Sequence, residues 1–137
     1  MQQNIQITNL KGVFVVARPV FSDERGSFQE VFRLAELEQV HGEPIIIRQI
    51  NKSISKTNVL RGLHIAPWGK LVYCYSGDIF QVVVDVRKNS ETYGEVFTCK
   101  LGEKNPKAVW VPPMCANGFL VTSKANAVYG YAVTAEF

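Results

Sequence analysis

Short hydrophobic runs recur along the whole chain and are separated by turn-forming residues. The runs are rich in valine, isoleucine, phenylalanine and tyrosine, which favour β-strands. They occupy residues 12–17, 27–32, 45–50, 70–75, 79–86, 95–101, 108–111, 117–123 and 127–133. Many short strands with turns between them are typical of a β-sandwich or barrel. The pattern therefore predicts an all-β fold.

The clearest turn signal lies at residues 76–78, between two of these runs. Gly77 supplies the positive φ that a tight turn needs, so the sequence predicts a hairpin here. In the second run, alternate positions place Ile79, Gln81, Val83 and Asp85 on one face. Because this face carries the polar groups of the run, we expect it to line a cavity.

A single helix is predicted over residues 34–40. Leu34, Leu37 and Val40 recur at helical spacing, and Gly42 and Pro44 follow as helix-ending residues. Residues 102–108 are expected to form an exposed loop. No internal repeat or linker interrupts the 137 residues, so we expect a single domain over residues 1–137.

Composition narrows the possible partners. The chain is 47% hydrophobic and 20% charged with a formal net charge of +3, and its basic residues are interspersed with acidic ones. This pattern does not favour nucleic acid, but a few converging basic side chains suit a small phosphate ester. The three cysteines show no paired spacing, which favours a reducing compartment. The chain begins without a signal-like segment and has no run long enough to span a membrane, so we expect a cytoplasmic protein that does not bind membranes.

The residues available for catalysis are few. With two histidines in the sequence, a metal site that needs about three imidazoles cannot form, and no nucleophile-elbow serine or glycine-rich phosphate loop is present. Acid–base chemistry by His64, near Arg61 and Lys70, remains. On a regular strand Arg61 and His64 lie on opposite faces, and a bend at Gly62 would bring them together. The pattern alone leaves two interpretations of His64 open, a hydrogen-bonded core residue and a catalytic base.

Four longer segments together resemble a known family. They are residues 20–32 (VFSDERGSFQEVF), 48–64 (RQINKSISKTNVLRGLH), 69–94 (GKLVYCYSGDIFQVVVDVRKNSETYG) and 109–121 (VWVPPMCANGFLV). In this order they are similar to the dTDP-4-dehydrorhamnose 3,5-epimerase family, over most of the chain. The resemblance implies a cupin-type β jelly roll that forms a homodimer and binds a nucleotide-diphosphate sugar with a 4-keto group. It implies no metal and no cofactor, and inversion of carbon centres next to the ketone.

The resemblance also implies roles for individual residues. His64 matches the family's base, and Lys70 matches the lysine near the keto oxygen. Residues that meet the nucleotide, contributed by the partner subunit, are Arg25, Phe28 and Glu30. Groups around the base and the diphosphate are Gln49, Asn51 and Arg61.

The sequence departs from the family at three places. Asn117 stands where the family commonly has histidine, and asparagine donates hydrogen bonds but cannot shuttle a proton. Val133 aligns near the family's catalytic tyrosine, so Tyr131, on the same strand face, is the best substitute for the acid, and it also suits a core aromatic residue. The family's acidic partner of the base comes from a later segment, so we expect His64 to lack one unless Asp85 serves. Asp85 alternatively has a structural role.

These departures leave several functions open. The leading prediction is an epimerase-like or isomerase-like enzyme that uses His64 as base and inverts one or two centres. The alternatives are a sugar-nucleotide binding protein that has lost the acid, and a structural jelly-roll subunit with a filled pocket. A 3,4-ketoisomerase is a further alternative, although the histidine-rich pattern of those enzymes is absent here.

Overall fold

The computed structural model describes residues 4–137, which contain twelve β-strands and one α-helix. The elements are β1 (Ile5–Ile7), β2 (Phe14–Val16), β3 (Val20–Asp23), β4 (Gly26–Gln29), α1 (Leu34–His41), β5 (Gln49–Ser55), β6 (Leu60–His64), β7 (Lys70–Ser76), β8 (Asp78–Asp85), β9 (Val96–Gly102), β10 (Ala108–Val111), β11 (Cys115–Val121) and β12 (Ala127–Val133).

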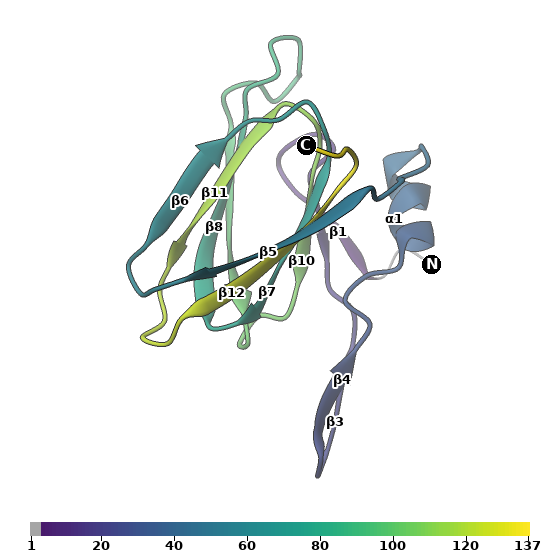
Figure 1. The fold of residues 1–137 in the computed structure, drawn as a ribbon. Helices are drawn as coiled ribbons and strands as arrows, with labels where there is room; N and C mark the ends of the chain where they lie inside the picture. The colour runs from purple at the N-terminus through teal and green to yellow at the C-terminus, as the bar shows by residue number, and fades with distance from the viewer. Residues whose placement is uncertain (1–3) are drawn as a thin grey trace.

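Two antiparallel sheets face each other and enclose the main core (Figure 1). One has six strands in the order β1-β2-β10-β7-β12-β5, and the other has four in the order β6-β11-β8-β9. The strands β3 and β4 form a separate hairpin that projects away from both sheets. The prediction of an all-β jelly roll with one short helix is confirmed.

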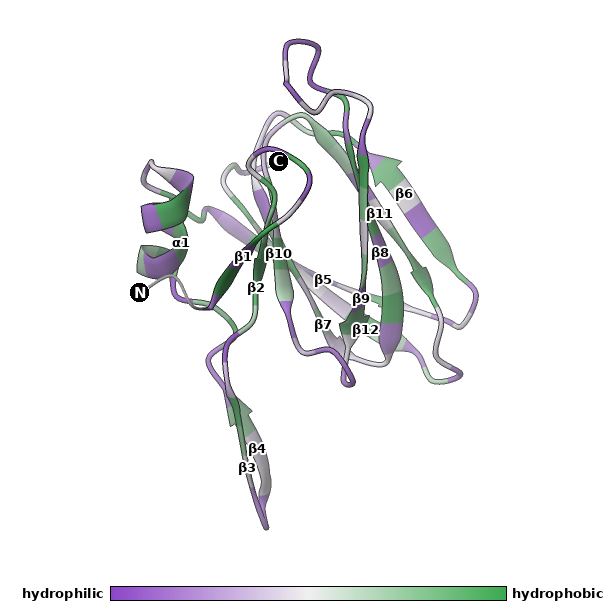
Figure 2. Ribbon diagram, turned by 180° about the vertical axis from the view of Figure 1, so that it is seen from behind, coloured by the Kyte–Doolittle hydropathy of each residue, from purple (hydrophilic) through white to green (hydrophobic). Residues whose placement is uncertain are grey.

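Within the six-stranded sheet, β2 and β10 are buried on both faces. On β10, Val109 and Val111 pack into the core between the sheets, whereas Ala108 and Trp110 pack into a second cluster. Helix α1 covers this second cluster through Leu37, which is fully buried. Burial on both faces explains why β2 and β10 read as continuous hydrophobic runs, and both are largely green in Figure 2.

Helix α1 follows the prediction closely. Its residues Leu34, Leu37 and Val40 pack towards the cluster under the helix. Gly42 ends the helix in the left-handed conformation with φ of 90°, and its N–H donates to the carbonyl of Glu38. Glycine adopts this conformation without steric cost, which is why it commonly terminates helices.

The predicted hairpin at residues 76–78 is wrong. Gly77 does form a turn with φ of 76°, but β7 pairs with β10 and β12, whereas β8 pairs with β11 and β9. The chain therefore crosses from one sheet to the other, and β7 and β8 face each other across the core. Both arrangements need the same turn residue and the same hydrophobic strands, so the local pattern does not distinguish them.

The strand predicted over residues 45–50 is displaced towards the C-terminus. Strand β5 begins at Gln49 and continues to Ser55, and its inward face is polar. Its outward residues include Ile50 and Ile54, which are 76% and 53% exposed. Hydrophobicity failed to mark this strand because its less exposed positions are polar and its isoleucines face outward.

Two further features concern membrane-spanning helices and the cysteine residues. None of the helices in the described part of the chain is long and apolar enough to cross a membrane. All three cysteines (Cys74, Cys99 and Cys115) are free thiols. Burial raises the pKa of each thiol to about 11, so all three stay protonated at neutral pH.

Candidate active site

A cavity of about 330 Å³ opens between the two sheets. Strands β6 and β11 of the four-stranded sheet form one wall, and β5, β7 and β12 of the six-stranded sheet form the opposite wall. The lining residues are Ser53, Arg61, His64, Ile65, Ala66, Trp68, Lys70, Val72, Asn117, Gly118, Phe119, Tyr129, Tyr131 and Phe137. The structure thus brings five of the predicted site residues together: His64, Lys70, Tyr131, Arg61 and Asn117.

A bulge at Gly62 places both Arg61 and His64 on the cavity. Across strands β6 and β11, Asn117 lies opposite His64 and Phe119 lies opposite Arg61. Two residues separate the pair on β6, but only one separates it on β11. The extra residue turns both side chains to the same side, as the predicted bend requires.

Gly62 suits this bulge for two reasons. Its φ is 126°, and a Cβ atom at this position would lie 2.7 Å from the Cα atom of Gly118. We expect Gly62→Ala to lower the free energy of unfolding by about 3 kcal/mol, from backbone strain and the backbone clash together. Urea unfolding measures this. The control is Gly26→Ala, because Gly26 has a similar φ of 137° and open space around it. Equal effects of the two substitutions would contradict a role for the close approach.

The imidazole of His64 is accessible. His64 is exposed and borders the cavity, and within residues 4–137 it makes no hydrogen bond or ion pair. The interpretation of His64 as a packed, hydrogen-bonded core residue is therefore wrong. A histidine without protein partners is able to accept a proton from a molecule in the cavity.

Lys70 and Tyr131 approach from the opposite wall. Lys70 on β7 has no hydrogen-bonding or ionic partner in the described part of the chain, and burial lowers the pKa of its ammonium group. Tyr131 lines the cavity on β12, and so does Tyr129. Val133 is fully buried and does not reach the cavity. A cation and a phenol therefore face the imidazole across the cavity.

Arg61 is held in place by its own neighbours. Its Nε donates to Ser55 Oγ at 2.6 Å, and Nη2 donates to the carbonyl of Ile54 at 3.4 Å. Neither partner carries a charge, so the positive charge of the guanidinium stays uncompensated. This arrangement suits an anion such as a phosphate.

The face of β8 that was expected to line a cavity lies behind the site. Ile79, Gln81, Val83 and Asp85 do point inward and are buried, but none of them borders the cavity. Gln81 reaches it indirectly, because its Nε2 donates to Oδ1 of Asn117 at 3.4 Å. The expectation was correct for the direction of this face and wrong for its contact with the cavity.

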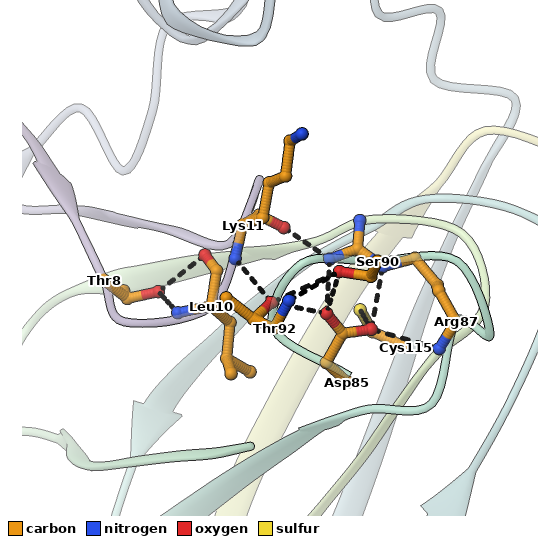
Figure 3. A network of polar contacts seen from close by, with 8 residues as sticks. All are labelled: Thr8, Leu10, Lys11, Asp85, Arg87, Ser90, Thr92 and Cys115. Carbon is orange, nitrogen blue, oxygen red and sulfur yellow. Dashed lines mark hydrogen bonds and ion pairs between the residues drawn. The ribbon is translucent and has the colours of Figure 1, made fainter. Parts of the chain in front are cut away.

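Asp85 does not orient His64. Its carboxylate accepts hydrogen bonds from Arg87, Ser90 and Thr92, and Arg87 Nε lies 2.9 Å from Oδ1 (Figure 3). These bonds, the Arg87 guanidinium first, hold the pKa of Asp85 well below its usual range. Figure 3 shows how the network joins the loop after β8 to the segment around Lys11. The structural interpretation of Asp85 is confirmed.

Three residues predicted to meet the nucleotide lie away from this cavity. Arg25 and Phe28 are on the projecting β3–β4 hairpin (Figure 1), where Arg25 pairs with Asp23 at 2.7 Å. Glu30, just after β4, accepts hydrogen bonds from Arg33 and Arg18, and Arg33 is the larger cause of its lowered pKa. Within its own chain, the hairpin does not contribute to the cavity.

Gln49 and Asn51 lie beside the cavity but not on its surface. Gln49 Nε2 donates to Asn51 Oδ1 at 2.9 Å, and Gln49 Oε1 accepts a hydrogen bond from the backbone N–H of Phe137 at 3.0 Å. Ser53, two positions further along the same inward face of β5, does border the cavity. Alternation along β5 was the signal that would have identified Ser53.

Sequence reasoning also missed an aromatic pair at the cavity. The rings of Trp68 and Phe137 stack with centroids 4.6 Å apart and an interplanar angle of 13°. The indole Nε1 of Trp68 and the hydroxyl of Ser53 are buried without a hydrogen-bond partner in residues 4–137. No periodicity marks Trp68, which lies in a turn between β6 and β7. The described residues hold no group of three or more potential metal ligands.

Comparison with known proteins identifies the family to which this chain is similar. The family model described as dTDP-4-dehydrorhamnose 3,5-epimerase matches residues 7–137. The epimerase of Methanothermobacter thermautotrophicus is 43% identical over 119 residues, which cover 85% of this chain and 64% of that protein. The epimerase of Shigella flexneri is 40% identical, with coverage of 92% and 72%. This chain therefore spans about two thirds of the length of these relatives.

Solved structures agree with the sequence comparison. The crystal structure of the Elizabethkingia anophelis epimerase superposes with a TM-score of 0.88 at 36% identity, covering 97% of this chain and 74% of that one. The 3,5-epimerase of Legionella pneumophila, solved in complex with dTDP-4-keto-L-rhamnose, has a TM-score of 0.90 at 35% identity, covering 98% and 72%. These structures have the cupin jelly roll. This chain belongs to the dTDP-4-dehydrorhamnose 3,5-epimerase family.

Proposed function

We propose that this protein is a sugar-nucleotide epimerase that acts on a nucleotide-linked 4-keto sugar. The observation that carries the proposal is the unpartnered His64 imidazole in the same cavity as Lys70 and Tyr131. Family membership supports the substrate class, because the Legionella relative was solved with a dTDP-linked 4-keto sugar. The proposal extends to location in the reducing cytoplasm, which the three free cysteines support.

The reaction requires three groups around the carbon that loses its proton: a base, a cation near the ketone oxygen and a proton donor. In the proposed reaction His64 removes the proton from a carbon next to the ketone, and the electron pair of that C–H bond moves to form an enolate. Lys70 stabilises the negative charge on the enolate oxygen. Tyr131 then donates its phenolic proton to the same carbon, the enolate returns to the ketone, and solvent restores both side chains.

The placement of the two proton-transfer groups favours inversion. His64 belongs to the four-stranded sheet and Tyr131 to the six-stranded sheet, so they approach a bound sugar from opposite walls. A proton removed on one side and returned on the other inverts the carbon centre. Arg61, with its uncompensated charge on the base side of the cavity, is the proposed ligand of the diphosphate.

Incubation with dTDP-4-keto-6-deoxyglucose in deuterated water tests this function. We expect deuterium at C3, at C5 or at both, detected by NMR and mass spectrometry, and the labelled positions identify the centres that are inverted. A parallel incubation with a GDP-linked 4-keto sugar tests the choice of nucleotide. Measurable binding of dTDP without any exchange would instead support the sugar-nucleotide binding protein.

Lys70 offers a second test of the reaction. We expect Lys70→Met to lower the exchange rate by roughly 10²–10³-fold, because the enolate loses its stabilising cation. The affinity for dTDP should change little, since the lost interaction forms mainly in the transition state. The control is Lys52→Met, because Lys52 lies on the outward face of β5 and is exposed. A Lys70→Met enzyme with normal exchange would remove Lys70 from the mechanism.

We also propose a homodimer in which the β3–β4 hairpin completes the partner's site. Phe21 and Phe28 on this hairpin are 63% and 66% exposed, which is unusual for neighbouring aromatic residues and fits a surface that a partner covers. A mixture of inactive His64→Asn and Arg25→Ala subunits tests the arrangement. If the hairpin acts in trans, mixed dimers contain one intact site and recover activity. No recovery in proven mixed dimers would contradict it.

A further inference from the structure

Behind the cavity, a chain of buried polar side chains connects three strands. The Tyr129 hydroxyl donates to Gln81 Oε1 at 2.9 Å, and Gln81 Nε2 donates to Asn117 Oδ1 at 3.4 Å. Gln81 is fully buried, and Tyr129 and Asn117 are 4% and 6% exposed. Such a network is costly to bury unless its members satisfy one another.

The hydrogen bonds of this network fix which end of each amide is the donor. The Gln81 Nε2 group also lies 3.5 Å from the backbone carbonyl of Val82, which can only accept a hydrogen bond. The amino end of Gln81 therefore faces Val82 and Asn117, and its oxygen faces the Tyr129 hydroxyl. Asn117 is left with its oxygen occupied. Its Nδ2 group has no acceptor within residues 4–137, and Asn117 borders the cavity.

We propose that Gln81 and Tyr129 are positioning residues that make Asn117 an obligate hydrogen-bond donor to the ketone oxygen of the bound sugar. This inference rests on the proposed function. Asn117 lies directly opposite His64 across β6 and β11. A carbonyl oxygen is therefore expected near Asn117 when the adjacent carbon is near His64. Asn117 and Lys70 then approach the oxygen from the two walls of the cavity.

The expected consequence is that the site distinguishes a sugar with a ketone at this position from one with a hydroxyl group. An amide that presents only N–H groups binds a ketone oxygen well, whereas a reversed amide would present its own oxygen and leave both oxygens without a donor. The network consists of neutral groups and orients the Asn117 amide without a proton transfer. It therefore needs no second imidazole, and His64 is the one histidine among the described residues that line the cavity.

Gln81→Glu tests the proposal once its carboxyl group is shown to be ionised, by its carboxylate band in the infrared spectrum, because burial opposes ionisation. The carboxylate accepts hydrogen bonds from both neighbours and so turns the Asn117 amide around. Isothermal titration at pH 8.5 compares three ligands: dTDP, dTDP-4-keto-6-deoxyglucose and the 4-hydroxy analogue dTDP-6-deoxyglucose. We expect the affinity for the keto sugar to fall roughly tenfold or more. The affinities for dTDP and for the 4-hydroxy analogue should stay within about twofold, since a hydroxyl is able to donate to the exposed Asn117 oxygen.

Two results would overturn the inference. If all three affinities fall together, Gln81 has a general structural role, and if none changes, it does not orient Asn117. Should Gln81→Glu fail to fold or stay protonated, Tyr129→Phe decides the question, because it removes one of the two groups that orient Gln81 and leaves the Val82 carbonyl in place. We expect it to cause a smaller, ketone-specific loss of affinity. These titrations measure binding and do not depend on turnover. If the wild-type protein binds the keto sugar without deuterium exchange, the proposed function is refuted, but the titrations still test the network.

Discussion

Replacement of His64 by asparagine is expected to lower the rate of deuterium exchange by roughly 10²–10⁴-fold, the usual contribution of a positioned general base. The reason is geometric: within the described residues, the cavity contains one imidazole, and it is free of protein partners. Asparagine keeps a polar side chain of similar reach but cannot accept the proton. The measurement is the rate of solvent deuterium incorporation into the 4-keto sugar at saturating substrate.

The second histidine provides a matched control. His41 lies on α1, where its ring packs edge-on against Trp110 with centroids 5.3 Å apart, on the opposite face of the six-stranded sheet from the cavity. We expect His41→Gln to retain the exchange activity. Exchange at the wild-type rate in His64→Asn would exclude His64 as the base and leave Tyr131 as the candidate.

Replacement of Asp85 by asparagine is expected to lower the free energy of unfolding by about 3 kcal/mol. Asp85 is fully buried and accepts hydrogen bonds from Arg87, Ser90 and Thr92. The substitution leaves the guanidinium of Arg87 without its charged partner and gives the two hydroxyls an amide in place of a carboxylate. Urea unfolding at pH 7 measures the loss.

The same carboxylate makes stability depend on pH. The Arg87 guanidinium and the hydroxyl donors lower the pKa of Asp85 in the folded protein, while the unfolded chain keeps a value of about 3.9. The stabilisation is therefore fully present above about pH 4 and is lost as the pH falls below that value, because the unfolded state binds the proton first. Below about pH 4 we therefore expect the free energy of unfolding to depend less steeply on pH in Asp85→Asn than in the wild type.

Glu91 in the same loop is the matched control for Asp85. Its side chain is 80% exposed and pairs with Lys11 at 3.6 Å. Exposed pairs contribute little because water and salt screen them. Glu91→Gln should leave both the unfolding midpoint and its pH dependence near those of the wild type. A similar loss of stability in both variants would mean that the effect comes from the change in net charge and not from the buried network.

The sequence by itself determined the all-β class, the helix and most strand positions. These features depend on local properties: β-branched and aromatic residues favour strands, Leu34, Leu37 and Val40 recur at helical spacing, and Gly42 permits the left-handed end. Four segments, residues 20–32, 48–64, 69–94 and 109–121, together indicated the family, which the comparisons confirm. The structural role of Asp85 was also predictable as one of two alternatives.

Only the tertiary structure decided which strands pair and which side chains share the cavity. The turn at Gly77 serves a hairpin and a crossing between sheets equally well, because pairing depends on distant partners. The bulge that brings Arg61 beside His64 depends on Gly118 of another strand. The direction of the Asn117 amide depends on Gln81 and Tyr129, which are far from it in sequence. Local patterns encode the conformation of a segment, whereas the chemistry of this site arises where the two sheets meet.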